Sequence, residues 1–248
     1  MNALIGQTGF VGSNLALQLP FDAKFSSRNI GDIRGKTFDT IVCAGAYAAK
    51  WKANQDPQAD RDAVEKLLAP LREVECARFV LISTVDVYER PALVDESSPA
   101  DATHAYGLHR RALEEFVAGR FPQAFVLRLP GLFAKGLKKN VIYDLLHDNQ
   151  VERIHPEGVF QYYSLEHLGA DIGRAVEHGW HVLNVATEPI TTRELSLRCF
   201  GRELSAYPAG GPPARYDFRT QYAPSGYLYD KAQVLREVTA FIAAERAL

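Results

Sequence analysis

The feature that most constrains the fold is a glycine-spaced turn near the start of the chain. Residues 1–19 have the sequence MNALIGQTGFVGSNLALQL, in which a short apolar run stops at Gly6 and a helical pattern follows. This order predicts a strand, a tight turn and a helix, because glycine allows unusual dihedrals and lets a pyrophosphate approach the free amides at the helix start. We therefore expect this turn to bind a dinucleotide, in contact with Gly6, Thr8, Gly9, Phe10, Val11 and Gly12. The alternative is a plain structural turn, for which glycines also serve.

Unalternating apolar runs recur along the first half of the chain. They cover residues 39–46, 78–83 and 123–129, as expected of strands that are covered on both faces. Helical patterns at 56–71 and 105–121 lie between them. This alternation predicts an α/β fold, a Rossmann-like doubly wound parallel sheet with right-handed crossovers.

We expect two parts with a soft boundary between them. Residues 1–128 would form a dinucleotide-binding core, and residues 129–248 the remaining core strands and helices plus a small substrate-binding cap. The second part is expected to contain helices at 140–147, 165–178, 192–200 and 229–246, a strand at 181–186 and a loop at 207–213. The link from Arg28 to Asp39 barely leaves room for the second crossover helix.

Composition excludes several classes of protein. The 248 residues are 47% hydrophobic, enough for a sizeable core, and the formal charge of −2 provides no broad positive field for nucleic acid. No apolar run approaches the ~18 to 20 residues that span a bilayer, and the start lacks the features of a signal peptide. Cys43, Cys76 and Cys199 are widely spaced, which fits a reducing cytoplasm. Histidines form no ligand-spaced cluster with cysteine or carboxylate, so no metal is expected.

The end of the second predicted strand bears on the choice of cofactor. An NAD site usually has an acidic residue about twenty residues after the glycines, but residues 23–28 have the sequence AKFSSR, without an acid. Ser27 and Arg28 would instead hold a 2′-phosphate through charge-assisted hydrogen bonds. We therefore expect NADP to be preferred over NAD. The alternative for Arg28 is a solvated loop cation.

A second constellation brings a family resemblance. Thr84 follows a predicted strand with Tyr88 four residues on, Tyr106 lies on the next helix, and Arg128-Leu129-Pro130 follows the next strand. With the glycine turn, this order resembles the extended short-chain dehydrogenase/reductases, and more narrowly the NAD-dependent epimerase/dehydratase family. The resemblance covers nearly the whole chain, because Asn140 resembles the substrate-side asparagine of that family and residues 184–195 its late strand-and-helix segment.

The resemblance implies an NAD(P)-dependent oxidoreductase or epimerase acting on a sugar, which would be nucleotide-linked. Tyr106 would be the acid/base and Thr84 its hydroxyl partner, with Ser83 as the neighbouring alternative, because hydride transfer at a sugar carbon requires a matched proton transfer. One departure is that Arg110 stands where the family has lysine. Arginine keeps the charge that would bias Tyr106 and bind the cofactor ribose, but it is planar, longer and permanently protonated, and so departs from lysine in the proton-relay role. A non-catalytic dinucleotide-binding sensor or scaffold is the competing interpretation.

The remaining expected site residues divide between cofactor and substrate. Those expected to line the cofactor site are Ala44, Gly45, Ala46, Ser83 and Pro130, and those expected to contact substrate are Asp86, Asn140 and Tyr162. The alternative for Asp86 is an ordinary exposed carboxylate, and for Tyr162 half-buried packing. The resembling dehydratases carry a second acid where this chain has Val85, so we rank dehydratase chemistry low. His109 lies about 100° around the helix from Arg110 and is expected at the surface. A homodimer is an expectation from the resemblance.

Overall fold

The computed structural model describes residues 1–204 and 211–247, which divide into two compact units. The first unit comprises Met1–Arg90, Ser98–Arg128 and Glu166–Leu183, and the second comprises Pro91–Ser97, Leu129–Leu165 and the described chain from Asn184 onwards. The chain thus leaves the first unit briefly at Pro91–Ser97, leaves it again after Arg128, and returns to it for the segment Glu166–Leu183. The loop expected at 207–213 lies largely outside the described residues.

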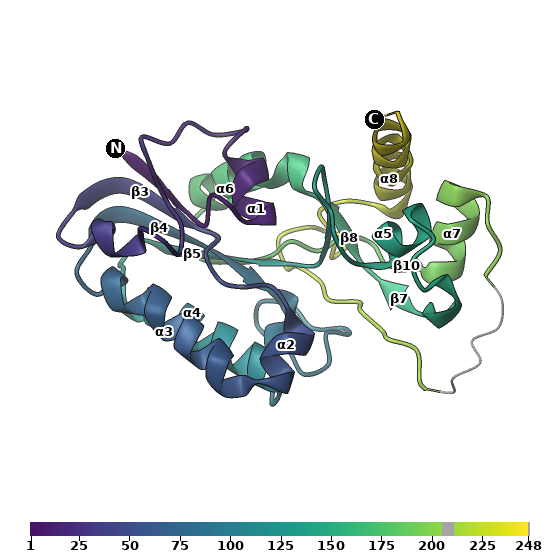
Figure 1. Ribbon diagram of the computed structural model, residues 1–248, viewed down its shortest axis with the longest axis horizontal. Helices are drawn as coiled ribbons and strands as arrows, with labels where there is room; N and C mark the ends of the chain where they lie inside the picture. Colours follow the sequence, from purple (N-terminus) through teal and green to yellow (C-terminus); the bar gives the residue numbers. More distant parts are fainter. Residues whose placement is uncertain (205–210, 248) are drawn as a thin grey trace. The chain divides into compact units, whose positions relative to one another are not determined.

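A six-stranded sheet with the order β2-β1-β3-β4-β5-β9 is the centre of the first unit (Figure 1). Its strands are β1 (Asn2–Ile5), β2 (Ala23–Phe25), β3 (Thr37–Cys43), β4 (Glu75–Thr84), β5 (Ala124–Leu129) and β9 (Val182–Asn184). Strand β1 pairs in parallel with both β2 and β3, and β3 pairs in parallel with β4. The predicted Rossmann-like α/β fold is confirmed. The strand order reverses between β1 and β3, where open α/β sheets bind ligands beyond the carboxyl ends of their strands.

Helices cover both faces of this sheet. Figure 1 shows α1 (Phe10–Leu15) and α6 (Leu168–Glu177) on one face, and α3 (Pro57–Leu71) and α4 (Ala105–Arg120) on the other. Helix α3 begins where the sequence predicts, because Asp56 accepts a hydrogen bond from the amide of Ala59 and a proline occupies the first helical position. The helices predicted at 56–71 and 105–121 are confirmed to within a residue or so at each end.

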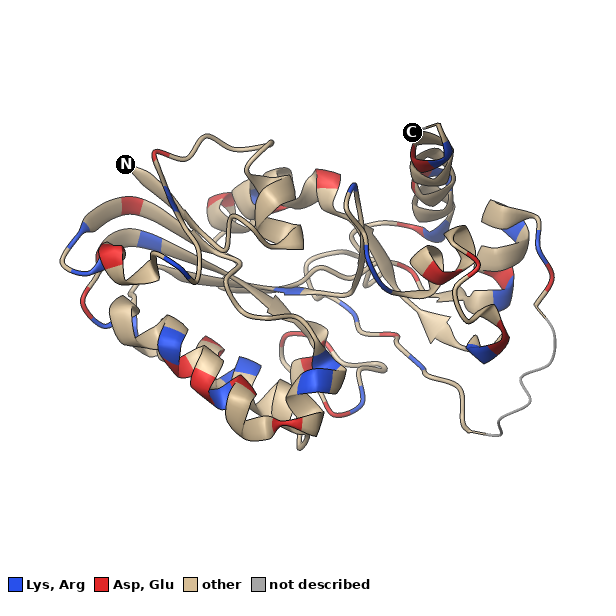
Figure 2. Ribbon diagram, in the orientation of Figure 1, with Lys and Arg blue, Asp and Glu red and all other residues tan. Residues whose placement is uncertain are grey.

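The buried core lies between the sheet and helices α3 and α4. Ile41 and Leu81 are completely buried, and the ring of Phe79 stacks on that of Phe121 with their centroids 4.4 Å apart. Between β2 and β3 the chain forms only one 3-10 turn, Ile30–Ile33, so the expected shortage of room for a crossover helix is confirmed. The outer faces of α3 and α4 carry both acidic and basic side chains (Figure 2).

The second unit is built from small pieces. Strand β6 (Gly131–Phe133) pairs in parallel with β8 (Tyr162–Ser164), and β7 (Val159–Phe160) pairs antiparallel with β10 (Ile190–Thr191). Its helices are α5 (Val141–Leu146), α7 (Thr192–Phe200) and α8 (Lys231–Arg246), close to the bounds predicted for them. The helix expected at 165–178 is also present, as the 3-10 turn Leu165–His167 followed by α6.

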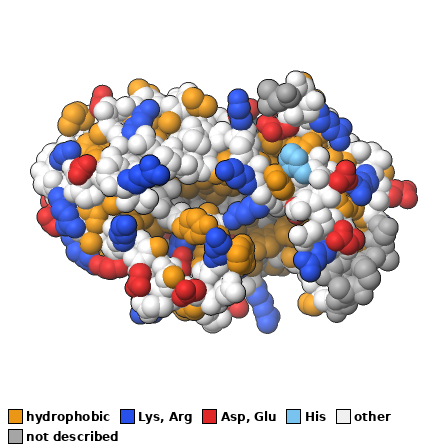
Figure 3. Space-filling view, viewed as in Figure 1, with side chains coloured by type: hydrophobic (Ala, Val, Ile, Leu, Met, Phe, Trp, Pro, Cys, Tyr) orange, Lys and Arg blue, Asp and Glu red, His pale blue; other side chains and the backbone are white. Residues whose placement is uncertain are grey.

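Charges of both signs are mixed on the surface of the protein. On the face shown in Figure 3, lysine and arginine side chains are interspersed with acidic ones. None of the helices among residues 1–204 and 211–247 combines the length and the apolar character that crossing a bilayer needs. A further helix, α2 (Lys50–Gln55), follows the loop after β3 and contributes to the site described next.

Candidate active site

The glycine turn after β1 is closed by backbone packing. Gly6 has a φ of +91°, and a Cβ added there would lie 2.3 Å from the carbonyl oxygen of Ala44 at the end of β3. A Cβ on Gly12 would lie 2.1 Å from the carbonyl oxygen of Gly6, so the first turn of α1 sits directly on the loop. Outside this packing the turn is open, because Thr8 and Gly9 are exposed and a Cβ on Gly9 would meet only one atom, at 3.3 Å. The turn therefore leaves room for phosphates beside its exposed residues.

The segments that flank this turn are those named from the sequence. The amide of Gly6 donates to the carbonyl oxygen of Phe25 over 2.8 Å, which holds the end of β2 beside the turn. The following loop is shaped by Asn29, whose side chain accepts from the amide of Ser26 at 2.7 Å, and it leaves Ser27 and Arg28 exposed. On the other side, the residues that follow β3, namely Ala44, Gly45 and Ala46, are half-buried or exposed.

The hydroxyl groups of Thr84 and Tyr106 are brought together. Thr84 is the last residue of β4, and Tyr106 lies in the first turn of α4, where its ring is almost completely buried. The Thr84 side chain lies close enough to the phenol to affect its ionisation. Burial raises the pKa of Tyr106 above its usual value, while the charge of Arg110 and the Thr84 side chain act in the opposite direction. The phenol is therefore protonated at neutral pH.

Arg110 is buried and bound to a carboxylate that the sequence interpretation missed. Its two terminal nitrogens each donate to Asp60 of α3, both at 2.9 Å, and one also donates to the carbonyl oxygen of Tyr47. Its guanidinium carbon lies 4.5 Å from the centroid of the Tyr106 ring, in a cation–π contact. Arg110 thus contacts the phenol, as expected, but its charge is balanced by Asp60.

The prediction that His109 lies at the surface is wrong. Its side chain is buried, and Nδ1 lies 2.8 Å from the same carboxylate of Asp60. Although about 100° apart around α4, His109 and Arg110 reach the same carboxylate, because α3 packs against α4 and supplies this acceptor. The prediction considered α4 alone, and the only sequence signal for the contact was an acid in the first turn of the preceding helix.

Asp86 is paired with a lysine that was also missed. The Nζ of Lys50, the first residue of α2, lies 2.7 Å from Oδ1 of Asp86. The amide of Asp86 in turn donates to Oγ1 of Thr84 over 3.2 Å. Lys50 comes shortly after a predicted strand, at the carboxyl edge of a parallel sheet, and that position was the available signal.

Ser83 belongs to a different network. Its hydroxyl donates to Glu114 over 2.5 Å, and Glu114 also accepts hydrogen bonds from Nε and Nη2 of Arg128. Arg128 donates in addition to the hydroxyl of Tyr88 over 2.7 Å. These contacts tie β4 and β5 to α4, and they engage the Ser83 hydroxyl with Glu114.

The candidate residues of the second unit are held within that unit. Asn140 has a φ of +117°, and its side chain donates to the carbonyl oxygen of Leu132 and accepts from the amide of Tyr143. Tyr162 is completely buried, which raises its pKa, and its hydroxyl has no hydrogen-bond partner among the described residues. Pro130 lies half-buried between β5 and β6.

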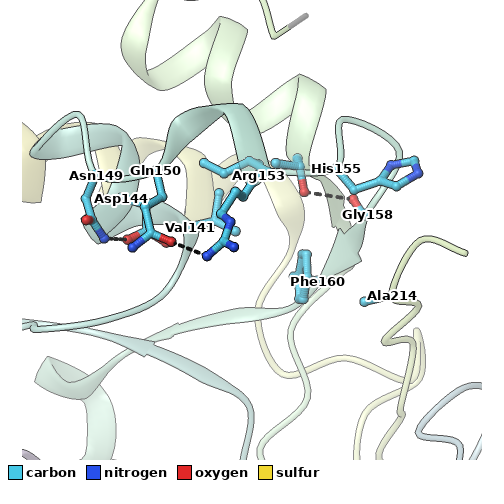
Figure 4. Close-up of a pocket in the computed structure, with 11 residues that line it drawn as sticks. Val141, Asp144, Asn149, Gln150, Arg153, His155, Gly158, Phe160 and Ala214 are labelled. Carbon is cyan, nitrogen blue, oxygen red and sulfur yellow. Dashed lines mark hydrogen bonds between the residues drawn. The ribbon is translucent and has the colours of Figure 1, made fainter. Parts of the chain in front are cut away.

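A cavity of about 290 Å³ lies within the second unit (Figure 4). It is lined by Val141, Asp144, Asn149, Gln150, Arg153, Ile154, His155, Gly158, Phe160, Thr192 and Ala214. Arg153 donates to the side chain of Gln150 over 2.7 Å, and Asn149 donates to Asp144 over 2.6 Å. The cavity combines an aromatic wall with polar groups, as small-molecule sites do, but it includes neither Asn140 nor Tyr162.

Comparisons with known proteins give similarity in structure and not in sequence. No protein-family model matches the chain, and no curated protein matches its sequence significantly. A dTDP-4-dehydrorhamnose reductase from Bacillus anthracis, solved in complex with NADP, is 15% identical, with a TM-score of 0.73 over 98% of this chain and 97% of its own. A UDP-N-acetylglucosamine 4-epimerase from Methanobrevibacter ruminantium, in complex with UDP-N-acetylmuramic acid, is 13% identical, with a TM-score of 0.75 over 99% and 98%.

A third solved structure of similar fold is a dehydratase. A double mutant of dTDP-glucose 4,6-dehydratase from Streptomyces venezuelae, solved with NAD bound, is 16% identical, with a TM-score of 0.75 over 100% of this chain and 98% of its own. The three proteins catalyse different reactions on one architecture. The chain therefore has the fold of nucleotide-sugar reductases, epimerases and dehydratases over essentially its whole length.

Proposed function

We propose that this protein is an NAD(P)-dependent oxidoreductase or epimerase acting on a sugar, nucleotide-linked in the simplest case, with Tyr106 as the acid/base. The observation that carries the proposal is the proximity of the half-buried Thr84 to the buried phenol of Tyr106 at the carboxyl edge of the sheet. The solved structures with this fold support it, since they hold NADP, NAD or a uridine diphosphate sugar derivative.

The residues around the glycine turn fit a dinucleotide. Gly6 and Gly12 permit the close packing of the turn, while Thr8 and Gly9 are exposed to receive phosphates. Arg28, with Ser27, would hold the 2′-phosphate of NADP, because the loop bearing them adjoins the turn and offers a cation rather than an acid. When bound, the nicotinamide would supply or accept hydride.

Residues of this chain would transfer the proton that accompanies the hydride. In reduction of a keto sugar, the Tyr106 hydroxyl would donate its proton to the carbonyl oxygen while Thr84 hydrogen-bonds the same oxygen. Burial favours the protonated phenol, which suits it as the donor in this direction. In the reverse direction the phenolate must form, and the adjacent charge of Arg110 would stabilise it.

For the substrate we propose contacts in each unit separately. Asp86, next to the hydroxyl pair, would accept hydrogen bonds from sugar hydroxyls. In the second unit Asn140 and Tyr162 stay proposed substrate contacts, and the cavity beside α5 is a candidate small-molecule site of that unit. The free Cys43, Cys76 and Cys199 are compatible with the reducing cytoplasm proposed for the protein.

A second candidate is a dinucleotide-binding protein without turnover. It is favoured by one observation, the balance of Arg110's charge by the buried Asp60, which weakens the stabilisation of a phenolate. Such a protein would bind the cofactor and leave every sugar unchanged. The homodimer implied by the family resemblance stays a prediction for either candidate.

The test combines binding and turnover. Fluorescence titration measures the Kd of NADPH and NADH, and absorbance of the reduced nicotinamide together with product analysis follows a panel of keto and hydroxy sugars. We expect Tyr106→Phe to lower kcat about 10²- to 10⁴-fold without changing the cofactor Kd. Thr84→Val should lower kcat as well, and Thr84→Ser, which keeps the hydroxyl, should retain most of it. Full activity in Tyr106→Phe would refute the proposed chemistry, and binding without turnover would favour the second candidate.

A further inference from the structure

The balance of charge around the buried phenol differs from what the residue types alone imply. Arg110 lies over the Tyr106 ring, but it donates to both oxygens of Asp60. Asp60 and Arg110 are both buried, so the charge of Arg110, which favours the phenolate, is shared with a counter-ion.

The negative charge of Asp86 also acts on the same phenol. Asp86 follows β4 by two residues, and a Cβ placed on Gly107 would be only 2.4 Å from its carbonyl oxygen, so this segment packs against the first turn of α4. The charge of Asp86 acts on Tyr106 in the direction that disfavours the phenolate. Left uncompensated, it would oppose any step that removes the phenol's proton.

Lys50 meets that negative charge directly. Its Nζ lies 2.7 Å from Oδ1 of Asp86, whose side chain is only 17% exposed. Helix α2, which carries Lys50, is tied to α4 because the Tyr106 amide donates to the side chain of Asn54 over 3.0 Å. The position of Lys50 is therefore linked to that of the phenol, unlike that of a lysine in a freely exposed ion pair.

We propose that Lys50 is the compensating cation of this site: it neutralises Asp86 beside the Thr84–Tyr106 hydroxyl pair, a role that Arg110 fills only in part because it is paired with Asp60. The inference deepens the proposed function and rests on it for its catalytic meaning. It makes Lys50 a positioning residue that acts through Asp86. The positive charge near the phenol is thus supplied by two residues, Arg110 on α4 and Lys50 on α2.

Other titratable groups lie on the elements around the phenol. His104 caps α4, accepting from the amide of Gly107, and is within electrostatic reach of Lys50, Asp86 and Glu89. Burial lowers the pKa of His104, and the charge of Lys50 lowers it further. In the alkaline range where a tyrosine titrates, His104 is therefore neutral and stays constant. The groups whose charges bear on Tyr106 there are Arg110 with Asp60, and Asp86 with Lys50.

The experiment compares Lys50→Met, Asp86→Asn and the double variant with the wild-type chain. Lys52→Met is the matched control, since Lys52 lies on the same helix but over the exposed rings of Tyr47 and Trp51. Two readouts are followed with pH: kcat for alcohol oxidation, and tyrosinate absorbance minus that of the same variant with Tyr106→Phe. Subtraction isolates Tyr106 among the 11 tyrosines, and circular dichroism defines the range in which all variants stay folded.

In Lys50→Met, the rise of kcat for alcohol oxidation with pH should occur about 0.5 to 1 pH unit higher than in the wild-type chain. At fixed pH, the ionised fraction of Tyr106 should be about three- to tenfold smaller. Asp86→Asn should shift the Tyr106 titration downward, and the double variant should return it close to the wild-type position. An unshifted Lys50→Met, or an equal shift in Lys52→Met, would overturn the role of Lys50. The absorbance readout needs no turnover, so the expected shifts without any sugar oxidation would refute the proposed enzyme while leaving the charge compensation established.

Discussion

Replacing Asp60 by alanine removes the one carboxylate that Arg110 and His109 share. Arg110 is only 3% exposed and His109 8%, so neither reaches water to replace the lost acceptor. Three hydrogen bonds of 2.8 to 2.9 Å would be broken, and the Arg110 charge would stay buried without its counter-ion. Breaking a buried ion pair by removing one partner costs about 3–5 kcal/mol, a large part of the roughly 5–15 kcal/mol of a typical domain.

The assay is urea unfolding followed by circular dichroism at neutral pH. With a urea slope of about 3 kcal/mol/M, at the upper end of the usual range, the expected loss lowers the unfolding midpoint by about 1–2 M. Glu115→Ala is the matched control, because Glu115 pairs with Arg111 on the exposed side of the same helix, and it should cost less than about 1 kcal/mol. If Asp60→Ala were no more destabilising than Glu115→Ala, the buried cluster would not hold α3 to α4.

Three further predictions follow from the structure. Arg28→Ala should weaken NADPH binding about tenfold and leave NADH binding unchanged, whereas Lys24→Ala, an exposed cation on β2, should alter neither in fluorescence titrations. Gly12→Ala should reduce the free energy of unfolding by at least about 2 kcal/mol because its Cβ would meet the Gly6 carbonyl oxygen, while Gly119→Ala, with open space around it, should not destabilise the chain. Burial alone would raise the pKa of Asp60, but hydrogen bonds from Arg110 and His109 outweigh it and hold the pKa below its usual range. The stability that Asp60 contributes is therefore complete above its unfolded pKa of about 3.9 and is lost as the pH falls through the folded value, so Asp60→Asn should flatten the acid limb of urea stability.

Much of the fold could be predicted because it depends on short-range signals. The turn at Gly6 and the helix that starts with Pro57 follow from backbone freedom and capping within a few residues. The parallel sheet follows from apolar runs alternating with helical periods. Even the missing crossover helix was visible as a link too short to contain one.

For the site, the sequence predicted candidate residues but not which of them contact one another. The spacing that relates Thr84 to Tyr106 was visible in the sequence, and the structure brings their hydroxyls together. The interpretation of Arg110 as a freely acting cation was incomplete, since Asp60 is fifty residues away along the chain. His109 was misplaced for the same reason, because the packing of α3 on α4 is not encoded in either helix alone.

By itself the amino-acid sequence determined where strands, turns and helices begin, and which hydroxyls and cations stand at the ends of strands. Only the tertiary structure decided which charges meet: Asp60 with Arg110, and Asp86 with Lys50. The physical reason is one of range. Capping and periodicity act within a few residues, whereas the charge state of a buried phenol depends on every group that packing brings near it, however distant in the chain.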